Sequence, residues 1–256
     1  YNYGTRGEVL SKYNINSSGY NSIYDYNAKD IDKKIALVGD SYVEGFHQDA
    51  SNSIGVKISK LTEYICYEYG VSSWDFNDYL KLISSDEFLN KNFDKIIISV
   101  NNRDFSYDTY NTSNAAYSHY IRQNSYFYQI YKNIKFISFL NQNGFLDQLK
   151  QVFKKTKNTQ SESADNQIDV FINMVNTYYD FDSRNIIFLI NSDDNYQAEF
   201  LSYIDENYQV LDIKESFNNS RAPINYGFDH HWNNNARELI AREISKVING
   251  VSNENN

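Results

Sequence analysis

The stretch Lys34-Ile-Ala-Leu-Val-Gly-Asp-Ser-Tyr-Val-Glu-Gly-Phe46 decides the fold class and supplies the first candidate functional residue. Its apolar run stops abruptly at Gly39-Asp40-Ser41, which is the pattern of a central strand ending in a tight turn. In α/β sheets, reactive groups collect at the carboxyl ends of strands, so Ser41 stands where chemistry is usually placed. A serine after glycine and aspartate is by default a turn or helix-cap residue, and Ser41 alone therefore does not establish a site.

Outward from this stretch, strand-like apolar runs alternate with segments of helical periodicity. The predicted strands are 34–38, 65–69, 94–100, 185–190 and 210–213. The predicted helices begin at Ser53 (apolar positions 54, 58, 61 and 65), at Ser73 and near 166 and 197, and a final helix, capped by Asn233, has apolar positions 236, 239, 240, 244 and 247. This alternation predicts an α/β fold, a three-layer α/β/α sandwich with a mainly parallel central sheet.

The length of 256 residues suits one large α/β domain. We expect residues 34–250 to form that domain, with 1–33 as a polar segment that wraps it without forming its core and 251–256 as a tail. Residues 105–165 break the alternation and are predicted to be a helical insertion or lid near the site.

Composition excludes several classes of function. The net charge of −9 argues against binding to nucleic acid, which requires a basic face. The sequence has no glycine-rich phosphate loop of the kind that would indicate a nucleotide cofactor. It has four histidines but no third ligand at a spacing that would indicate a metal site. Cys66 is the single cysteine and is predicted to be a packed, structural thiol. No apolar run spans a bilayer; the chain starts at Tyr1, so we expect that an upstream signal or anchor is missing.

A second stretch, Asp229-His-His-Trp-Asn233, can return a base to the serine. Acyl transfer by a serine needs a base to take the hydroxyl proton and a group to orient that base. His231 and Asp229 can supply these. His230 is the alternative base. Because adjacent side chains on an extended segment point in opposite directions, only one of the two histidines can face Ser41. The alternative is that His231 has no catalytic role and caps or packs against the last helix.

The tetrahedral intermediate of acyl transfer also needs donors for its oxyanion. The backbone N–H groups of Ser41 and Gly70, with a polar side chain from 101–103, are the candidates. Asp40 is expected to hold the turn. Glu44 and His47 are expected at solvated surface positions, with a place in the lining of the pocket as the alternative.

Three blocks of this chain resemble the SGNH (GDSL-type) hydrolase superfamily. Gly39-Asp40-Ser41 is similar to its nucleophile block, Tyr69-Gly70-Val71-Ser72 to its glycine block, and Asp229-His230-His231-Trp232-Asn233 to its closing block. The closing block has the spacing of the branch that includes alginate and other cell-surface polysaccharide O-acetyltransferases. The resemblance implies the SGNH, flavodoxin-like form of the fold and favours His231 as the base.

One block departs from the superfamily pattern. The superfamily usually has Gly-x-Asn-Asp after its third core strand, with the asparagine donating to the oxyanion. Aligned on Asp104, this chain has Asn101-Asn102-Arg103-Asp104, which puts arginine where asparagine is expected. Either Arg103 or Asn102 would complete the oxyanion hole.

The resemblance implies a serine-dependent acyl-ester enzyme, an O-acetyltransferase acting on a cell-surface or secreted polysaccharide. An esterase with the same triad is the alternative, and a degenerate domain that binds glycans without turnover is a third. Trp232 and Tyr42 are candidate substrate contacts, although Trp232 has a packing interpretation as well. The expected partners are an acetyl donor, a carbohydrate acceptor and a membrane-bound or envelope protein. We expect a monomer outside the bacterial cytoplasm, with no cofactor and no metal.

Overall fold

The computed structural model describes residues 2–3, 9–26, 33–45, 47–105, 166–178, 185–227 and 230–250. The chain divides into two compact units, one formed by Tyr1–Phe105 with Gln167–Asn256 and one by Ser106–Asn166. The predicted insertion, from 106 onward, lies outside the described residues, as do the predicted tail 251–256 and the candidate Asp229.

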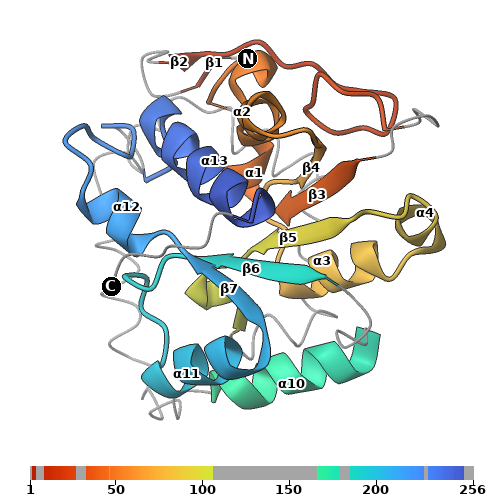
Figure 1. The fold of residues 1–256 in the computed structure, drawn as a ribbon, viewed down its shortest axis with the longest axis vertical. Helices are drawn as coiled ribbons and strands as arrows, with labels where there is room; N and C mark the ends of the chain where they lie inside the picture. Colours follow the sequence, from red (N-terminus) through yellow and green to blue (C-terminus); the bar gives the residue numbers. More distant parts are fainter. Residues whose placement is uncertain are drawn as a thin grey trace, which may run out of the picture. The chain divides into compact units, whose positions relative to one another are not determined.

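A five-stranded sheet in the order β4-β3-β5-β6-β7 forms the centre of the fold (Figure 1). Every neighbouring pair is parallel. The strands are β3 (Lys34–Gly39), β4 (Ile65–Gly70), β5 (Lys95–Ser99), β6 (Ile186–Ile190) and β7 (Gln209–Asp212). Two short N-terminal strands, β1 (Asn2–Tyr3) and β2 (Val9–Leu10), pair antiparallel. Each of the five predicted strands is therefore confirmed to within a residue or so.

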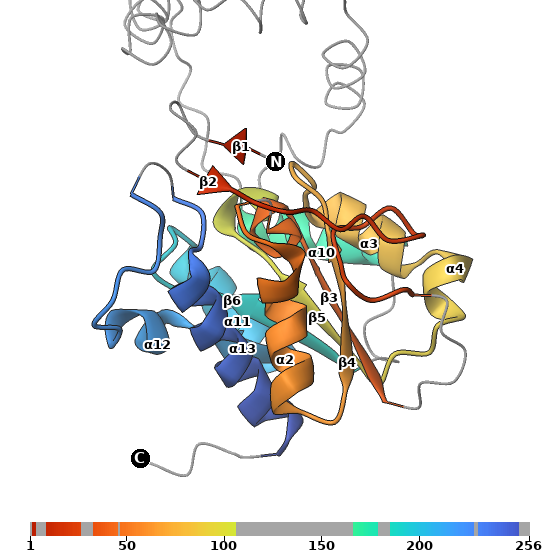
Figure 2. The same ribbon diagram turned by 90° about the horizontal axis from the view of Figure 1, so that it is seen from above.

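Helices cover both faces of this sheet, as Figure 2 shows from above. One face carries α1 (Ser41–Glu44), α2 (Ile54–Leu61), α12 (Lys214–Asn218) and α13 (Asn234–Ile248). The other carries α3 (Phe76–Ile83), α10 (Gln167–Tyr178) and α11 (Ala198–Asn207), and the remaining short helices are η1 (Ala50–Asn52), α4 (Asp86–Leu89) and η2 (Asn102–Phe105). The predicted three-layer α/β/α sandwich is confirmed.

Alternation along the strands divides the core into two layers. Ile35 and Leu37 of β3 lie in the cluster that contains the buried residues of α2 and α13. Ala36 and Val38 lie in the other cluster, which α3 and α10 complete. Because successive strand residues face opposite sides, a strand covered on both faces is apolar throughout, as the sequence of β3 is.

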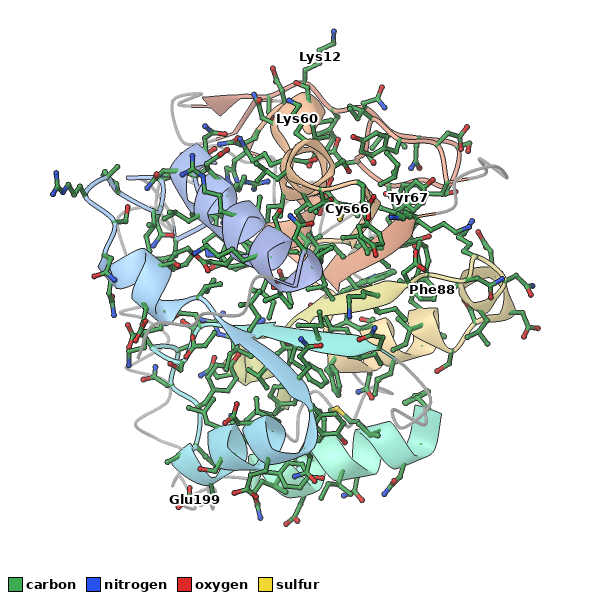
Figure 3. The ribbon with its side chains drawn as sticks, in the orientation of Figure 1. Lys12, Lys60, Cys66, Tyr67, Phe88 and Glu199 are labelled. Atoms are coloured by element: carbon green, nitrogen blue, oxygen red, sulfur yellow. The ribbon has the colours of Figure 1, made fainter. Side chains whose placement is uncertain are left out.

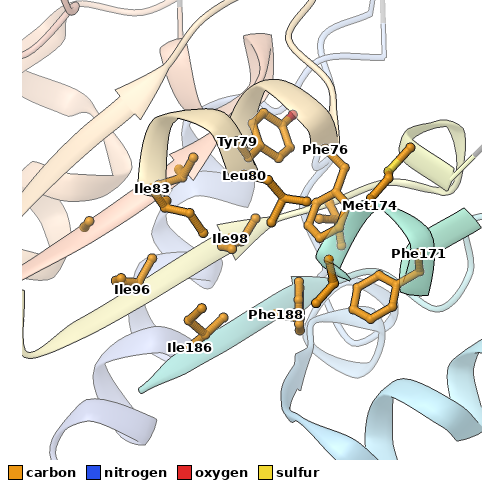
Figure 4. Close-up of a cluster of buried hydrophobic side chains, with 14 of the residues drawn as sticks. Phe76, Tyr79, Leu80, Ile83, Ile96, Ile98, Phe171, Met174, Ile186 and Phe188 are labelled. Atoms are coloured by element: carbon orange, nitrogen blue, oxygen red, sulfur yellow. The ribbon is translucent and has the colours of Figure 1, made fainter. Parts of the chain in front are cut away.

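The cluster under α3 and α10 is rich in aromatic side chains (Figure 4). The rings of Phe76 and Phe171 stack at 5.4 Å between centroids, and Phe188 of β6 contacts both. Figure 3 shows the side chains of the described residues over the fold and labels Cys66 and Tyr67, two residues of β4. Cys66 is fully buried, which confirms its predicted packing position.

Polar side chains fix the helix starts. Ser53 caps α2 by accepting the N–H of Val56 at 3.3 Å, and Asn233 caps α13, both as predicted. Two predicted boundaries are wrong. The helix after Ser53 ends at Leu61, and Ile65 begins β4. The helix expected from Ser73 begins at Phe76, because Asp75 forms a capping box with Asp78.

The N-terminal segment packs along β4, one of the two edge strands of the sheet. The phenol of Tyr26 donates to the carbonyl of Glu68, and its ring contacts those of Tyr67 and Tyr69, each at 4.9 Å. Tyr20 contacts Tyr69 at the same distance. Tyr26 is buried in the core and Tyr20 packs against it, so the expectation that the N-terminal segment stays outside the core is wrong at Tyr26.

No helix in the described part of the chain has the length and apolar character needed to cross a membrane.

Candidate active site

Ser41 lies where β3 gives way to α1, at the carboxyl end of the sheet. Asp40 caps α1 by accepting the N–H of Tyr42 at 2.9 Å, which supports its predicted structural role. Gly45 ends the helix one turn later, with a left-handed φ of 67° and its N–H donating to the carbonyl of Ser41 at 3.1 Å. The serine is therefore the first residue of a one-turn helix that is fixed at both ends.

The structure brings Ser41 and His231 together across 190 residues of sequence. The Ser41 hydroxyl and Nε2 of His231 are 2.9 Å apart, a hydrogen-bonding distance. This is the pair of groups that nucleophilic catalysis by serine requires. Asp229, the predicted third member, lies outside the described residues, and its role stays a prediction.

Backbone tethers hold the segment that carries His231. The carbonyl of His231 accepts the N–H of Tyr226 at 3.1 Å, and the N–H of Asn233 donates to Ile224 at 2.9 Å. The Asn233 amide also donates to the carbonyls of Pro223 and Asn225. Because these bonds are made by the carbonyl of His231 and by Asn233 two residues later, the backbone of His231 is fixed relative to the start of α13.

Aromatic rings surround His231. Tyr42 and His47 contact its imidazole at centroid distances of 4.8 and 4.7 Å. Trp232 packs edge-on against Tyr42 at 4.7 Å and also contacts Phe217. Trp232 thus packs against the hydrophobic cluster beneath α13, and the ring of Tyr42 contacts both Trp232 and His231.

His230 has a different environment from His231. Its side chain is exposed, and its carbonyl lies 3.4 Å from the Tyr42 hydroxyl. Of the two adjacent histidines, the structure places His231 against Ser41.

Two expectations about neighbouring residues are wrong. His47 is buried, with its ring between those of His231 and Tyr226. Glu44 is half-buried and accepts hydrogen bonds from Ser72, including its N–H at 2.6 Å, and from the Tyr13 hydroxyl at 3.2 Å. Residue type did not reveal that Tyr226 and His231 would cover His47, or that the N-terminal segment and the loop after β4 would contact Glu44.

Gly70 is needed for close packing. It lies opposite Gly39 in the sheet, and a Cβ at this position would stand 2.1 Å from the backbone nitrogen of Glu44 in α1. Along β4, the N–H groups of Ile65 and Val71 point to β3, whereas that of Cys66 points away. By this alternation the N–H of Gly70 also points away from β3, and its role as an oxyanion donor stays a prediction.

The Asn101–Asp104 turn is organised around a buried carboxyl group. Asp104 accepts the N–H of Asn101 at 2.8 Å, and the Asn101 side chain accepts the N–H of Arg103 at 3.0 Å. Burial raises the pKa of Asp104, and the nearby carboxyls of Asp40 and Asp75 raise it further. Asp104 is thus a structural residue of the turn.

The structure places both candidate side chains of this turn beside the loop after β6. The Asn102 amide lies 3.4 Å from the carbonyl of Asn195. The charge of Arg103 acts on Asp194, where it opposes the rise in pKa that burial produces. Which of the two completes an oxyanion hole stays a prediction.

Arg237 is a residue that the sequence interpretation missed. It is fully buried in α13, and its Nε donates to the carbonyl of Trp232 at 3.3 Å. The available signal was its spacing: Arg237 is four residues before Ala241 and seven before Ile244, on the apolar face of the helix.

Among the described residues, no group of three or more histidine, cysteine, aspartate or glutamate side chains is arranged to hold a metal ion.

Comparison with known proteins gives structural neighbours only, since no protein-family model and no curated protein matches the chain. A protein described as lipolytic, of the G-D-S-L family, from Desulfitobacterium hafniense is similar over 84% of this chain and 99% of its own, with 14% identity and a TM-score of 0.47.

Two further solved structures are similar to this chain. The lipase/acylhydrolase from Enterococcus faecalis is similar over 86% of this chain and 96% of its own, at 14% identity and a TM-score of 0.46. A two-domain esterase active on acetylated mannans is similar over 87% of this chain and 50% of its own, at 12% identity and a TM-score of 0.49.

Proposed function

We propose that this protein is a serine-dependent acyl-ester enzyme of the SGNH type. The observation that supports it is the 2.9 Å contact between the Ser41 hydroxyl and Nε2 of His231, at the carboxyl end of the sheet. An imidazole at this distance can take the hydroxyl proton as the oxygen attacks a carbonyl carbon. The role we propose for Asp229 is to orient the imidazole of His231.

The proposed reaction has two halves. Ser41 attacks the ester carbonyl, its proton passes to His231, and the departing alcohol takes that proton as the bond to the acyl group breaks. The acyl group is then an ester of Ser41. In the second half, an acceptor hydroxyl gives its proton to His231 and attacks this ester. Ser41 recovers its proton and the acylated acceptor leaves.

We further propose that the acyl group is acetyl and that the acceptor is a hydroxyl of a cell-surface or secreted polysaccharide. The spacing of the closing block, Asp229 to Asn233, supports this, because it resembles that of polysaccharide O-acetyltransferases. Tyr42 and Trp232, beside His231, are the proposed contacts for the sugar. The enzyme would act as a monomer outside the cytoplasm, with a membrane-bound or envelope partner that supplies the donor.

Turnover of a chromogenic acetyl ester tests the proposal, with the wild-type protein compared with Ser41→Ala, His231→Ala and His230→Ala. Ser41→Ala and His231→Ala should each lower kcat by about 10⁴-fold or more, because both groups act in one step. His230→Ala is the matched control and should retain most of the activity. Substantial activity in Ser41→Ala would refute the assignment, and the reverse ranking of the two histidines would assign the base to His230.

An oligosaccharide acceptor separates transfer from hydrolysis. Acetylated sugar that appears only with the acceptor would establish a transferase. Acetate released regardless of the acceptor would make the protein an esterase. A protein that neither turns over the ester nor reacts at Ser41 with a fluorophosphonate would be a glycan-binding domain without catalysis.

A further inference from the structure

Arg237 is an energetically costly residue for the interior of this fold. It is 0% exposed, and only its Nε donates a hydrogen bond, to the carbonyl of Trp232. Within the described part of the chain, neither Nη1 nor Nη2 has a hydrogen-bond partner. A buried cation with unfilled donors does not stabilise a fold relative to an apolar side chain of similar size. Stability therefore does not explain its presence.

The guanidinium packs directly against the end of the nucleophile helix. A Cβ on Gly45 would lie 2.2 Å from Nη1 of Arg237 and 3.0 Å from Cζ, so the guanidinium occupies the space that a side chain at position 45 would take. Gly45 also has a left-handed φ of 67°, and its N–H donates to the carbonyl of Ser41. The end of the Arg237 side chain thus rests on the residue that closes the turn begun by Ser41.

The same side chain is bonded to the histidine segment. The Trp232 carbonyl that accepts from Nε belongs to the residue immediately after His231. Ser41 and His231 lie on segments far apart in sequence, and their 2.9 Å contact depends on how these segments are spaced. Arg237 contacts both segments. It bonds to Trp232, the residue after His231, and it packs against Gly45, which ends the helical turn that Ser41 begins.

We infer that Arg237 is a positioning residue that sets the separation of the Ser41 hydroxyl and His231 Nε2. The inference rests on the proposed function for its catalytic consequence. Its length fills the space between Gly45 and the start of α13, and its Nε–H fixes the Trp232 carbonyl. Catalytic groups must be held to within about 0.5 Å of their productive geometry, and a single contact that fixes two segments meets this need.

Arg237→Met tests the inference, because methionine is a long, apolar side chain that cannot donate to Trp232. The rate of fluorophosphonate labelling at Ser41 and the kcat for an acetyl ester should both fall by about 10- to 100-fold. KM should change little. Tm should stay close to the wild-type value, because the relief of a buried charge is offset by the loss of its attraction to the buried carboxyl of Glu68. Ser245→Ala is the matched control: Ser245 is also buried in α13, but its hydroxyl bonds within the helix, and its labelling rate should stay at the wild-type value.

Labelling of Arg237→Met at the wild-type rate would overturn the inference. A loss of labelling that follows a loss of Tm would also overturn it, because that result is the one a purely structural residue gives. If Arg237→Met does not fold, Arg237→Gln, which is neutral and too short to reach Gly45, is measured against the same criteria.

A failure of the proposed function would be recognised separately, since wild-type protein would then not label at Ser41. In that case crystal structures of the wild type and of Arg237→Met decide the inference. A longer distance between the Ser41 hydroxyl and His231 Nε2 in the variant would support it, and an unchanged distance would overturn it.

Discussion

Glu68 should make the stability of this protein depend on pH in an unusual direction. Its side chain is buried beside Gly55, whose N–H donates to Oε1 at 2.8 Å. Burial raises the pKa of Glu68 from 4.5 to about 7, although the nearby charge of Arg237 lowers it in part. The folded protein therefore holds this proton more tightly than the unfolded chain does.

The sign of the effect follows from this order of pKa values. The stability that the protonated carboxyl contributes is fully present below the unfolded pKa of 4.5 and is lost as the pH rises through about 7. The gap between the two values corresponds to about 3 kcal/mol of unfolding free energy. The glutamine of Glu68→Gln cannot ionise. The unfolding free energy of this variant, measured relative to that of wild type, should therefore be about 2–3 kcal/mol higher at about pH 8 than at about pH 5.

Urea unfolding of both proteins at the two pH values measures this difference, because groups that titrate alike in both cancel. Ser245→Ala serves as the control, since a buried hydroxyl does not titrate in this range and its difference from wild type should be the same at each pH. If the free energies of Glu68→Gln and wild type differ by the same amount at both pH values, Glu68 does not titrate between them and the reasoning from burial is wrong.

Two further changes test packing and capping. Gly70→Ala should lower the unfolding free energy by about 1–3 kcal/mol, because the new Cβ meets the backbone of Glu44, whereas Gly227→Ala, with open space around it, should leave thermal unfolding unchanged. Asn233→Ala should cost about 1–2 kcal/mol in chemical denaturation, because it removes the cap of α13 and the bonds to Pro223 and Asn225. An Asn233→Ala protein as stable as wild type would show that the cap is redundant.

The order of strands and helices could be predicted from the sequence because the parallel sheet is covered on both faces. Each strand is then a continuous apolar run, as 35–38 is, and each run ends where turn residues begin. Short helices such as α4 and α12 were missed, since one turn of helix leaves too few residues for a periodic pattern. Ser73 was mistaken for a helix start; its φ of 70° places it in a left-handed turn before the Asp75 cap.

The pairing of Ser41 with His231 could be predicted because both follow from the local pattern of short blocks. The surroundings of the pair could not. His47 and Arg237 are polar residues, and their burial depends on contacts with Tyr226 and Gly45, far away in the sequence. Which polar groups a fold encloses is a property of tertiary packing, and residue type alone does not reveal it.

The contact of Tyr26 with β4 bears on how this protein avoids aggregation. An edge strand offers unpaired N–H and C=O groups that can recruit a strand from another molecule. On β4, the hydroxyl of Ser59 bonds the N–H of Cys66, and the phenol of Tyr26 bonds the carbonyl of Glu68. Side chains thus take up edge groups of β4 that a further strand would otherwise bond. Cleavage that released the N-terminal segment would uncover this edge together with Tyr67 and Tyr69, and would turn a closed margin into a template for intermolecular β-pairing.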